Sequence, residues 1–344
     1  MIDLKSLIRP NILNLKPYAS ARHEFSGHGE IFLDANENPY ESNVNRYPDP
    51  MQLEIKHRLS QIKGIDARQI FAGNGSDESI DLAIRIFCEP GKDEIMTLPP
   101  TYGMYQVSAD IANIGIQRVP LNLSFQLDLD KIFSSIKSNT KIIFICSPNN
   151  PTGNLIHKKD IVRILDTFNG IVVVDEAYID FVAGESMIEF ISKYPQLIIL
   201  QTLSKAWGLA GVRLGMAFAN EEIIGYYNKV KAPYNINILT QQFVVNALKD
   251  ENKMKAQVNE ILAQRAWLIN ELPKYPEVIK IYPSDTNFIL VKVRAADSTY
   301  RQLVTKGIVV RNRSKENGTE NCLRITIGTP QENQILLNTI SNIK

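Results

Sequence analysis

The sequence predicts an α/β protein with a larger domain built on a mostly parallel sheet, flanked by helices, and a smaller α+β domain. From residue 95 onward, short apolar runs alternate with amphipathic stretches, which is typical of parallel strands joined by crossover helices. After Ala232-Pro233 the pattern changes to one or two long helical stretches over 238–272. Two strand-rich segments and a helical tail follow those stretches. The change in pattern indicates a second domain with a different architecture.

The proposed boundaries place the large domain at residues 30–235 and assign residues 236–344, together with 1–29, to the small domain. Residues 1–29 are polar with scattered Leu and Ile, so we expect an arm or a short helix that wraps another part of the structure. Ile31–Leu33 is predicted to be a short strand leading into the turn-forming sequence DANENPY at 34–40.

The remaining elements follow from hydrophobic spacing and from turn residues. Apolar residues at helical spacing predict a helix over 51–62 that ends at Gly64, and a second helix over about 157–168. In the small domain, strand–turn–strand is predicted over 279–293, and helix, turn and strand over 300–313. Further strands are predicted at 116–120, 171–174, 197–201, 212–219 and 322–328, with a helix over 330–344. The segment 141–153 is predicted to be a buried strand that ends in a Pro/Asn/Gly turn.

Composition and charge exclude several classes of protein. The chain has 344 residues, 44% of them hydrophobic and 22% charged, with a formal net charge of +1. This balance favours neither nucleic acid nor an anionic membrane as a partner. No apolar run approaches the roughly 18 residues that span a bilayer, and the N-terminus lacks the apolar core of a signal peptide. We therefore expect a cytoplasmic enzyme.

The cysteines and histidines show no metal-binding or disulfide pattern. The three cysteines, Cys88, Cys146 and Cys322, are far apart among apolar neighbours and are predicted to be buried thiols. The four histidines lack metal-ligand spacing, so no metal site is expected.

A glycine-rich turn at 73–78, GNGSDE, opens a predicted helix. Gly73 and Gly75 allow the backbone to approach a ligand closely, and free N–H groups at a helix N-terminus bind anions. Ser76 and Asp77 lie where capping side chains are favoured. An ordinary capped helix also explains this segment.

The segment TLSKAWGLAGVRLG at 202–215 contains an amine, a hydroxyl and a guanidinium separated by small residues. Lys205 can form a Schiff base with an aldehyde if its surroundings lower its pKa. Ser204 and Arg213 can hold a phosphate. An aldehyde and a phosphate on one small molecule indicate pyridoxal phosphate, although a loop with solvated Lys and Arg side chains gives the same sequence.

Other polar residues follow predicted strands whose carboxyl ends should meet at one edge of the sheet. Asp175 emerges from a buried strand and can hold the protonated pyridine nitrogen of that cofactor. Tyr178 and Asn150 can bind the ring oxygen, and Tyr102 can stack on the ring. Turn or core packing remains the alternative for each of them.

Together these stretches resemble the fold-type I aminotransferases, and within them the histidinol-phosphate aminotransferase family. The resemblance covers nearly the whole chain in the family's order. It rests on NLKPYASAR at 14–22, LDANENPY at 33–40, NRYPDP at 45–50, GNGSDE at 73–78, PPTYGMY at 99–105, CSPNNPTG at 146–153, VVDEAYIDF at 173–181, TLSKAWGLAGVRLG at 202–215 and CLRITIGT at 322–329.

The resemblance implies a fold-type I transferase that binds pyridoxal 5'-phosphate as a Schiff base on Lys205. It implies catalytic roles for Lys205, which moves the proton, for Asp175, which pairs with the ring nitrogen, and for Tyr178. Tyr47 is expected to reach the cofactor phosphate from the partner subunit of a homodimer. The cofactor contacts that it implies within one chain are Gly75, Ser76, Asp77, Tyr102, Asn150, Asp175, Tyr178, Ser204, Lys205 and Arg213.

For the substrate, the resemblance implies that Arg324 binds the anionic end, assisted by Arg311, Tyr18 and Asn36, with the N-terminal arm closing over it. The implied reaction is a ping-pong amino transfer between L-histidinol phosphate and 2-oxoglutarate in L-histidine biosynthesis. Its products are imidazole-acetol phosphate and L-glutamate.

Three alternatives are weighed against this interpretation. An aromatic-amino-acid aminotransferase or a decarboxylase of a phosphorylated amino acid would share the cofactor site and differ only in the pocket. A pyridoxal-phosphate-sensing regulator would need a DNA-binding domain, for which the match beginning near residue 14 leaves no room. A nucleotide-binding protein is disfavoured because the chain contains no G-x-x-x-x-G-K-[ST] or G-x-G-x-x-G loop.

Overall fold

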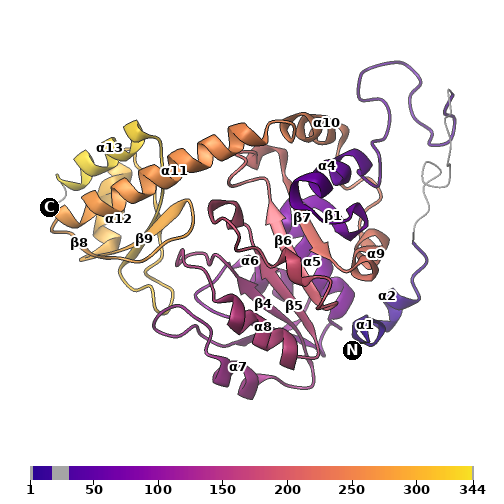
Figure 1. The fold of residues 1–344 in the computed structure, drawn as a ribbon, viewed down its shortest axis with the longest axis horizontal. Helices are drawn as coiled ribbons and strands as arrows, with labels where there is room; N and C mark the ends of the chain where they lie inside the picture. The colour runs from indigo at the N-terminus through magenta and orange to yellow at the C-terminus, as the bar shows by residue number, and fades with distance from the viewer. Residues whose placement is uncertain (1–2, 18–30, 343–344) are drawn as a thin grey trace.

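The computed structural model describes residues 3–17 and 31–342, and within them two β-sheets organise the chain (Figure 1). The larger sheet has the strand order β1-β7-β6-β5-β4-β2-β3. Neighbouring strands are parallel except at β7, which is antiparallel to both β1 and β6. The strands are β1 Ile70–Asn74, β2 Glu94–Thr97, β3 Gly115–Arg118, β4 Thr140–Cys146, β5 Ile171–Asp175, β6 Leu197–Thr202 and β7 Leu214–Ala219.

The central strands are apolar along their whole length because both faces of the larger sheet are buried. In β5, Val172 and Val174 belong to one hydrophobic cluster, whereas Ile171 and Val173 belong to the cluster on the opposite face. Such continuous apolar runs are expected of parallel strands covered by helices on both sides. The connecting helices are α4 Leu53–Lys63, α5 Gly75–Phe87, α6 Met104–Ile111, α7 Leu129–Ser135, α8 Lys158–Thr167 and α9 Glu221–Val230.

The smaller sheet has the order β10-β11-β9-β8 and is antiparallel throughout. Its core is a separate cluster with α12 and α13 on one side, and α11 contributes to that cluster through Leu268. The elements are β8 Val278–Ile281, β9 Phe288–Val293, α12 Ala296–Thr305, β10 Arg311–Asn312, β11 Cys322–Thr326 and α13 Pro330–Ile340.

Two helices join the sheets. Helices α10, Ile238–Ala247, and α11, Glu251–Glu271, account for the long helical stretch predicted after Pro233. Met254 and Val258 of α11 pack into a cluster on the larger sheet, whereas Leu268 packs on the smaller sheet. At about 1.5 Å per residue, the 21 residues of α11 extend about 30 Å, enough to reach both cores (Figure 1).

The structure differs from the sequence predictions at the N-terminal side. Residues 31–33 form no strand, because Ile31 and Leu33 are exposed and pair with no neighbouring strand within the described residues. Helices α1 Leu4–Leu7 and α2 Pro10–Leu13 pack on α5 and α9 of the larger sheet, and the backbone N–H of Arg9 donates to the Ile86 carbonyl at 3.0 Å. The described part of the arm therefore lies against the larger sheet. The division into 30–235 and 1–29 with 236–344 stays a proposal.

Candidate active site

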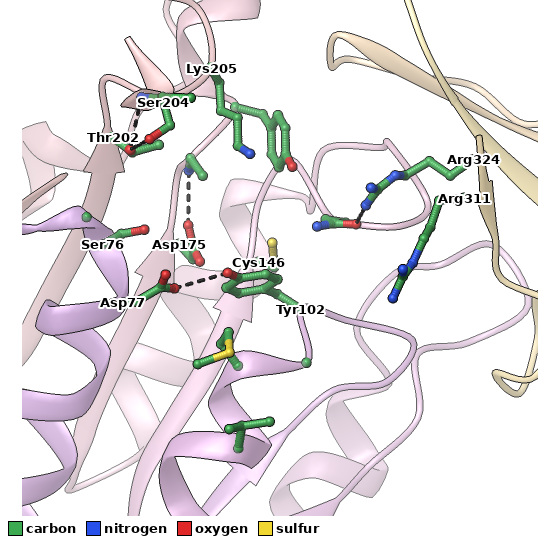
Figure 2. A pocket seen from close by; sticks show the side chains of 18 of the residues that line it. Ser76, Asp77, Tyr102, Cys146, Asp175, Thr202, Ser204, Lys205, Arg311 and Arg324 are labelled. Atoms are coloured by element: carbon green, nitrogen blue, oxygen red, sulfur yellow. Dashed lines mark hydrogen bonds between the residues drawn. The ribbon is translucent and has the colours of Figure 1, made fainter. Parts of the chain in front are cut away.

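A cavity of about 560 Å³ lies where β4, β5 and β6 end, between the larger sheet and the β10–β11 pair (Figure 2). Parallel strands bring their carboxyl ends to the same edge, so Cys146, Asp175 and Thr202 meet there. The cavity brings together twelve of the predicted site residues, namely Gly75, Ser76, Asp77, Tyr102, Asn150, Asp175, Tyr178, Ser204, Lys205, Arg213, Arg311 and Arg324.

Asp175 places a buried carboxylate at the floor of this cavity. The hydroxyl of Tyr105 donates to its Oδ2 at 2.7 Å, and the backbone N–H of Ala177 donates to its Oδ1 at 3.0 Å. Burial raises the pKa of Asp175, while these two hydrogen bonds oppose the rise by favouring the charged form. A carboxylate held in this way is suited to pair with a cation in the cavity.

Tyr105 is a site residue that the sequence analysis missed. Its ring is fully buried and stacks on Phe144 of β4 at 4.7 Å between centroids. The only signal in the sequence was its position three residues after Tyr102. Nothing in the sequence indicates that its hydroxyl reaches Asp175, which lies 70 residues further along the chain.

Lys205 extends from the turn after β6 toward the centre of the cavity (Figure 2). Its Nζ lies 5.5 Å from the centroid of the Tyr178 ring. Burial lowers the pKa of Lys205, with a further decrease from the nearby Arg324 guanidinium, while Asp175 opposes both effects. A lowered pKa increases the fraction of neutral amine, which is the nucleophilic form.

The start of α5 forms one wall of the cavity together with β7. A Cβ atom placed on Gly215 of β7 would lie 2.1 Å from the backbone nitrogen of Ser76, and one on Gly75 would lie 2.6 Å from Nη2 of Arg213. Only glycine permits the approach at Gly215, where the obstacle is backbone, and the positive φ of Gly75, 73°, favours glycine at that position. The first N–H groups of a helix have no partner within the helix, so this wall, which we call the anion cradle, has the donors that an anion requires.

The hydroxyl of Ser204 and the guanidinium of Arg213, which were predicted to hold a phosphate, lie beside this cradle. Thr202 Oγ1 donates to Ser204 Oγ at 3.0 Å and accepts from the Ser204 backbone N–H at 3.1 Å, which fixes the turn before Lys205. Arg213 has a left-handed backbone, φ 55°, and its Nη2 lies 3.6 Å from Oδ2 of Asp77. Positive φ is uncommon for arginine and is found mainly where surroundings impose it.

Arginines from the smaller sheet line the opposite end of the cavity. Arg311 and Arg324 are directly opposed in the antiparallel pairing of β10 and β11. Arg324 Nη1 donates to the Asn150 side-chain oxygen, and its guanidinium lies 5.2 Å from the Phe288 ring centroid. Arg313 also lines the cavity, and the sequence analysis did not identify it.

Three predicted residues are not in this cavity. Asn36 and Tyr47 line a separate cavity of about 520 Å³, in which Tyr47 stacks on Tyr234 at 4.3 Å between ring centroids. Tyr18, expected to contact the substrate from the arm, lies outside the described residues.

The expectations about cysteines and membranes can also be compared with the structure. Cys88, Cys146 and Cys322 are all free and buried, as predicted. Within residues 3–17 and 31–342, no group of three or more His, Cys, Asp or Glu side chains is arranged to hold a metal ion. None of the helices described is long and apolar enough to cross a membrane.

The family profile described as aminotransferase class I and II matches residues 31–340. The chain belongs to the class I and II aminotransferases. It is 56% identical to the histidinol-phosphate aminotransferase of Parabacteroides distasonis, over 100% of both chains.

Solved structures of aminotransferases share the fold. The crystal structure of the histidinol-phosphate aminotransferase from Clostridium acetobutylicum has a TM-score of 0.81 and 25% identity, covering 88% of this chain and 91% of that one. The enzyme of the same name from Sinorhizobium meliloti, in complex with pyridoxal-5'-phosphate, has a TM-score of 0.80 at 21% identity, covering 88% and 83%. The predicted fold-type I architecture is therefore confirmed for this aminotransferase.

Proposed function

We propose that this aminotransferase uses pyridoxal 5'-phosphate to move an amino group between L-histidinol phosphate and 2-oxoglutarate, giving imidazole-acetol phosphate and L-glutamate. One observation carries the proposal. A single cavity holds the amine of Lys205 between a buried carboxylate with an anion cradle at one end and the guanidiniums of Arg311 and Arg324 at the other. The 56% identity to a histidinol-phosphate aminotransferase over the full chain supports the choice of substrate.

The residues present fit the cofactor in charge and in shape. Asp175 suits a protonated pyridine nitrogen, because its buried carboxylate already accepts two hydrogen bonds and has no cationic partner of its own within 4 Å among the described residues. The cradle at Gly75, Ser76 and Asp77 suits a phosphate because these residues line the cavity at the N-terminus of α5, where the first N–H groups of a helix have no partner within the helix. Ser204 and Arg213 lie beside this cradle and would add a hydroxyl and a guanidinium.

Within this arrangement, each side chain has a distinct task. When bound, the cofactor supplies an electron sink that stabilises negative charge on the substrate carbon. Lys205 would hold the cofactor covalently through its Nζ, and its free amine would carry a proton from the substrate carbon to the cofactor carbon. Asn150 and Tyr178 would bind the ring oxygen, and Tyr102 would cover the ring face. Tyr102 is kept in place by its hydroxyl, which donates to Oδ1 of Asp77 at 3.0 Å.

The arginine end would bind the anionic group of each substrate in turn. Arg324 is held by Asn150, and Arg311 lies opposite it on the neighbouring strand, so two forks are available for a phosphate or a carboxylate. Binding energy from this remote group would orient the reacting carbon over Lys205.

We also propose a homodimer in which Tyr47 of one subunit reaches the cofactor phosphate of the other. Tyr47 and Asn36 do not line the active-site cavity of their own chain. They lie near exposed apolar side chains, including Val44 at 50% and Leu239 at 63% exposure. A second copy covering this surface would bury these side chains. It would also bring Tyr47 and Asn36 to the active-site cavity of the second copy.

The decisive experiment incubates the protein and pyridoxal phosphate with L-histidinol phosphate and 2-oxoglutarate and measures glutamate. Phenylalanine, tyrosine and phosphorylated amino acids tested in parallel distinguish an aromatic aminotransferase, and carbon dioxide release would identify a decarboxylase. Turnover of the aromatic amino acids without turnover of histidinol phosphate would refute the proposed substrate.

The role of Lys205 has a test that does not depend on turnover. Borohydride reduction followed by peptide mass spectrometry should locate the cofactor on Lys205. Lys205→Ala should remove that adduct and lower kcat by at least about 10²–10⁴-fold, the typical contribution of one general acid–base group. An adduct on a different lysine would refute the assignment.

A further inference from the structure

The pairing of β10 with β11 gathers three guanidiniums on one face of the smaller sheet. Arg311 is opposite Arg324 in the antiparallel register, and the backbone N–H of Arg313 continues the ladder by donating to the Cys322 carbonyl at 2.9 Å. Side chains two residues apart in a strand point to the same face. Arg311, Arg313 and Arg324 accordingly all line the cavity, although only two of them were expected there.

The backbone of Arg313 is held more firmly than that of an ordinary loop residue. Its carbonyl accepts from the Thr319 hydroxyl at 2.9 Å and from the Glu316 backbone N–H at 3.2 Å. Together with the bond to Cys322, these contacts fix both peptide groups of Arg313 at the edge of the sheet. The side chain is therefore presented to the cavity from a rigid support, so less entropy is lost when it binds an anion.

The Arg313 side chain is only partly satisfied in this position. Its Nη2 pairs with Oε1 of Glu316 at 2.9 Å, and the side chain is only 12% exposed. Its Nε–H is buried and has no hydrogen-bond partner among the described residues. Burial lowers the pKa of Arg313, Glu316 opposes this effect, and the neighbouring Arg324 and Arg311 reinforce it. A buried donor without a partner beside two like charges is a costly arrangement that a bound anion would relieve.

The charge of this cluster distinguishes between the two substrate groups that the site must accept. The three guanidiniums and the Glu316 carboxylate leave two positive charges unmatched. A phosphate monoester carries about −1.5 to −2 at neutral pH and has three acceptor oxygens, whereas a carboxylate carries a single charge and two oxygens. Only the phosphate can match the charge of the cluster and also offer an acceptor oxygen to a third guanidinium.

We propose that Arg313, held by Glu316, determines specificity by adding a third guanidinium that favours a phosphate monoester over a carboxylate at this end of the cavity. This inference rests on the proposed function, since it assigns the phosphate of histidinol phosphate to the arginine cluster. Arg311 and Arg324 serve both substrates, and Arg313 serves the phosphate substrate.

The test compares the two half-reactions of Arg313→Gln, reconstituted with pyridoxal phosphate. In ping-pong kinetics, kcat/KM for each substrate reports only its own half-reaction. Loss of a charge-assisted hydrogen bond should lower kcat/KM for histidinol phosphate by about 10- to 100-fold, mainly through KM. The value for glutamate should change less than about 3-fold, which also shows that the variant is folded and loaded with cofactor.

Two further variants separate this role from a general effect of charge or structure. Arg313→Lys keeps the positive charge but loses the paired N–H donors of the guanidinium. Its kcat/KM for histidinol phosphate should lie between the values for wild type and Arg313→Gln. Lys315→Gln removes the same charge from an exposed neighbour that does not line the main cavity, so it should leave both half-reactions within about 2-fold. Equal loss in both half-reactions, no loss in either, or an equal effect of Lys315→Gln would overturn the proposal.

Inorganic phosphate gives a readout that does not need histidinol phosphate as a substrate. As a competitive inhibitor of the glutamate half-reaction in the holoenzyme, it should bind about 10-fold more weakly to Arg313→Gln than to wild type. Suppose that wild type fails to turn over histidinol phosphate while phosphate still inhibits it about 10-fold more strongly than it inhibits Arg313→Gln. In that case the proposed function is refuted and the role of Arg313 in phosphate binding is supported. If wild type turns over histidinol phosphate and phosphate inhibits both forms equally, Arg313 does not select phosphate.

Discussion

The hydrogen bond from Tyr105 to Asp175 is the contact whose removal tests the cofactor site most directly. Tyr105→Phe deletes one hydroxyl and keeps the ring, which stacks on Phe144 with planes 13° apart. The substitution leaves Asp175 with the Ala177 N–H as its remaining hydrogen-bond donor. Because Tyr105 is fully buried, water does not replace the lost donor.

The size of the effect follows from the charge of the acceptor. A hydrogen bond to a charged group contributes about 1.5–3 kcal/mol, and one pKa unit corresponds to about 1.4 kcal/mol. Removing the Tyr105 donor should therefore raise the pKa of Asp175 further, above a value that burial has already raised. More of the carboxyl is then protonated near neutral pH, and a protonated carboxyl cannot pair with the pyridine nitrogen.

The assay is equilibrium binding of pyridoxal phosphate to apo-enzyme, followed by absorbance between pH 6 and 9. The dissociation constant of Tyr105→Phe should exceed that of wild type by about 10-fold at pH 7. The difference should widen as the pH falls, because protonation of Asp175 competes with cofactor binding, and narrow as the pH rises.

Tyr227→Phe is the matched control. Tyr227 is also fully buried, and its hydroxyl donates to the Ser79 carbonyl at 3.0 Å, away from Asp175. This variant should lower stability without a pH-dependent change in cofactor affinity. The reasoning about Tyr105 is refuted if both variants shift affinity alike, or if the Tyr105→Phe difference is the same at every pH.

Two other predictions concern packing and pH. Gly215→Ala should lower Tm by several degrees and weaken cofactor binding, because the added Cβ meets the Ser76 nitrogen at 2.1 Å and overpacking costs about 1–3 kcal/mol. Gly211→Ala is the control, because its Cβ meets nothing within 4 Å. Equal Tm values for the two variants would contradict the prediction. Burial raises the pKa of Glu176 from 4.5 to about 7. The folded state then binds more protons than the unfolded state between these values, so this group's contribution to stability falls as pH rises through that window. Urea unfolding should show wild type losing about 3 kcal/mol relative to Glu176→Gln between pH 4.5 and 7, and a constant difference would count against the raised pKa.

The sequence by itself determined the fold class, the buried strands that lead to the site and the residues around Lys205, because these depend on local spacing, but it did not indicate helices α6 and α7. Short runs rich in β-branched residues, such as Ile171–Val174, favour strands buried on both faces, and Gly75 before Ser76 indicates a backbone that can approach a ligand closely. The strand expected at Ile31–Leu33 was wrong, since a run of three apolar residues forms a strand only where a neighbouring edge is available to pair with it.

Only the tertiary structure decided which further side chains join the predicted residues at the site. Tyr105 reaches Asp175 because α6 packs beside β4, a relation that no spacing within either segment encodes. Arg313 joins Arg311 because the register between β10 and β11 continues past the assigned strand. Long-range register and helix packing result from the burial of whole faces, and the contribution of any one residue to that burial is too small to be recognised in the sequence.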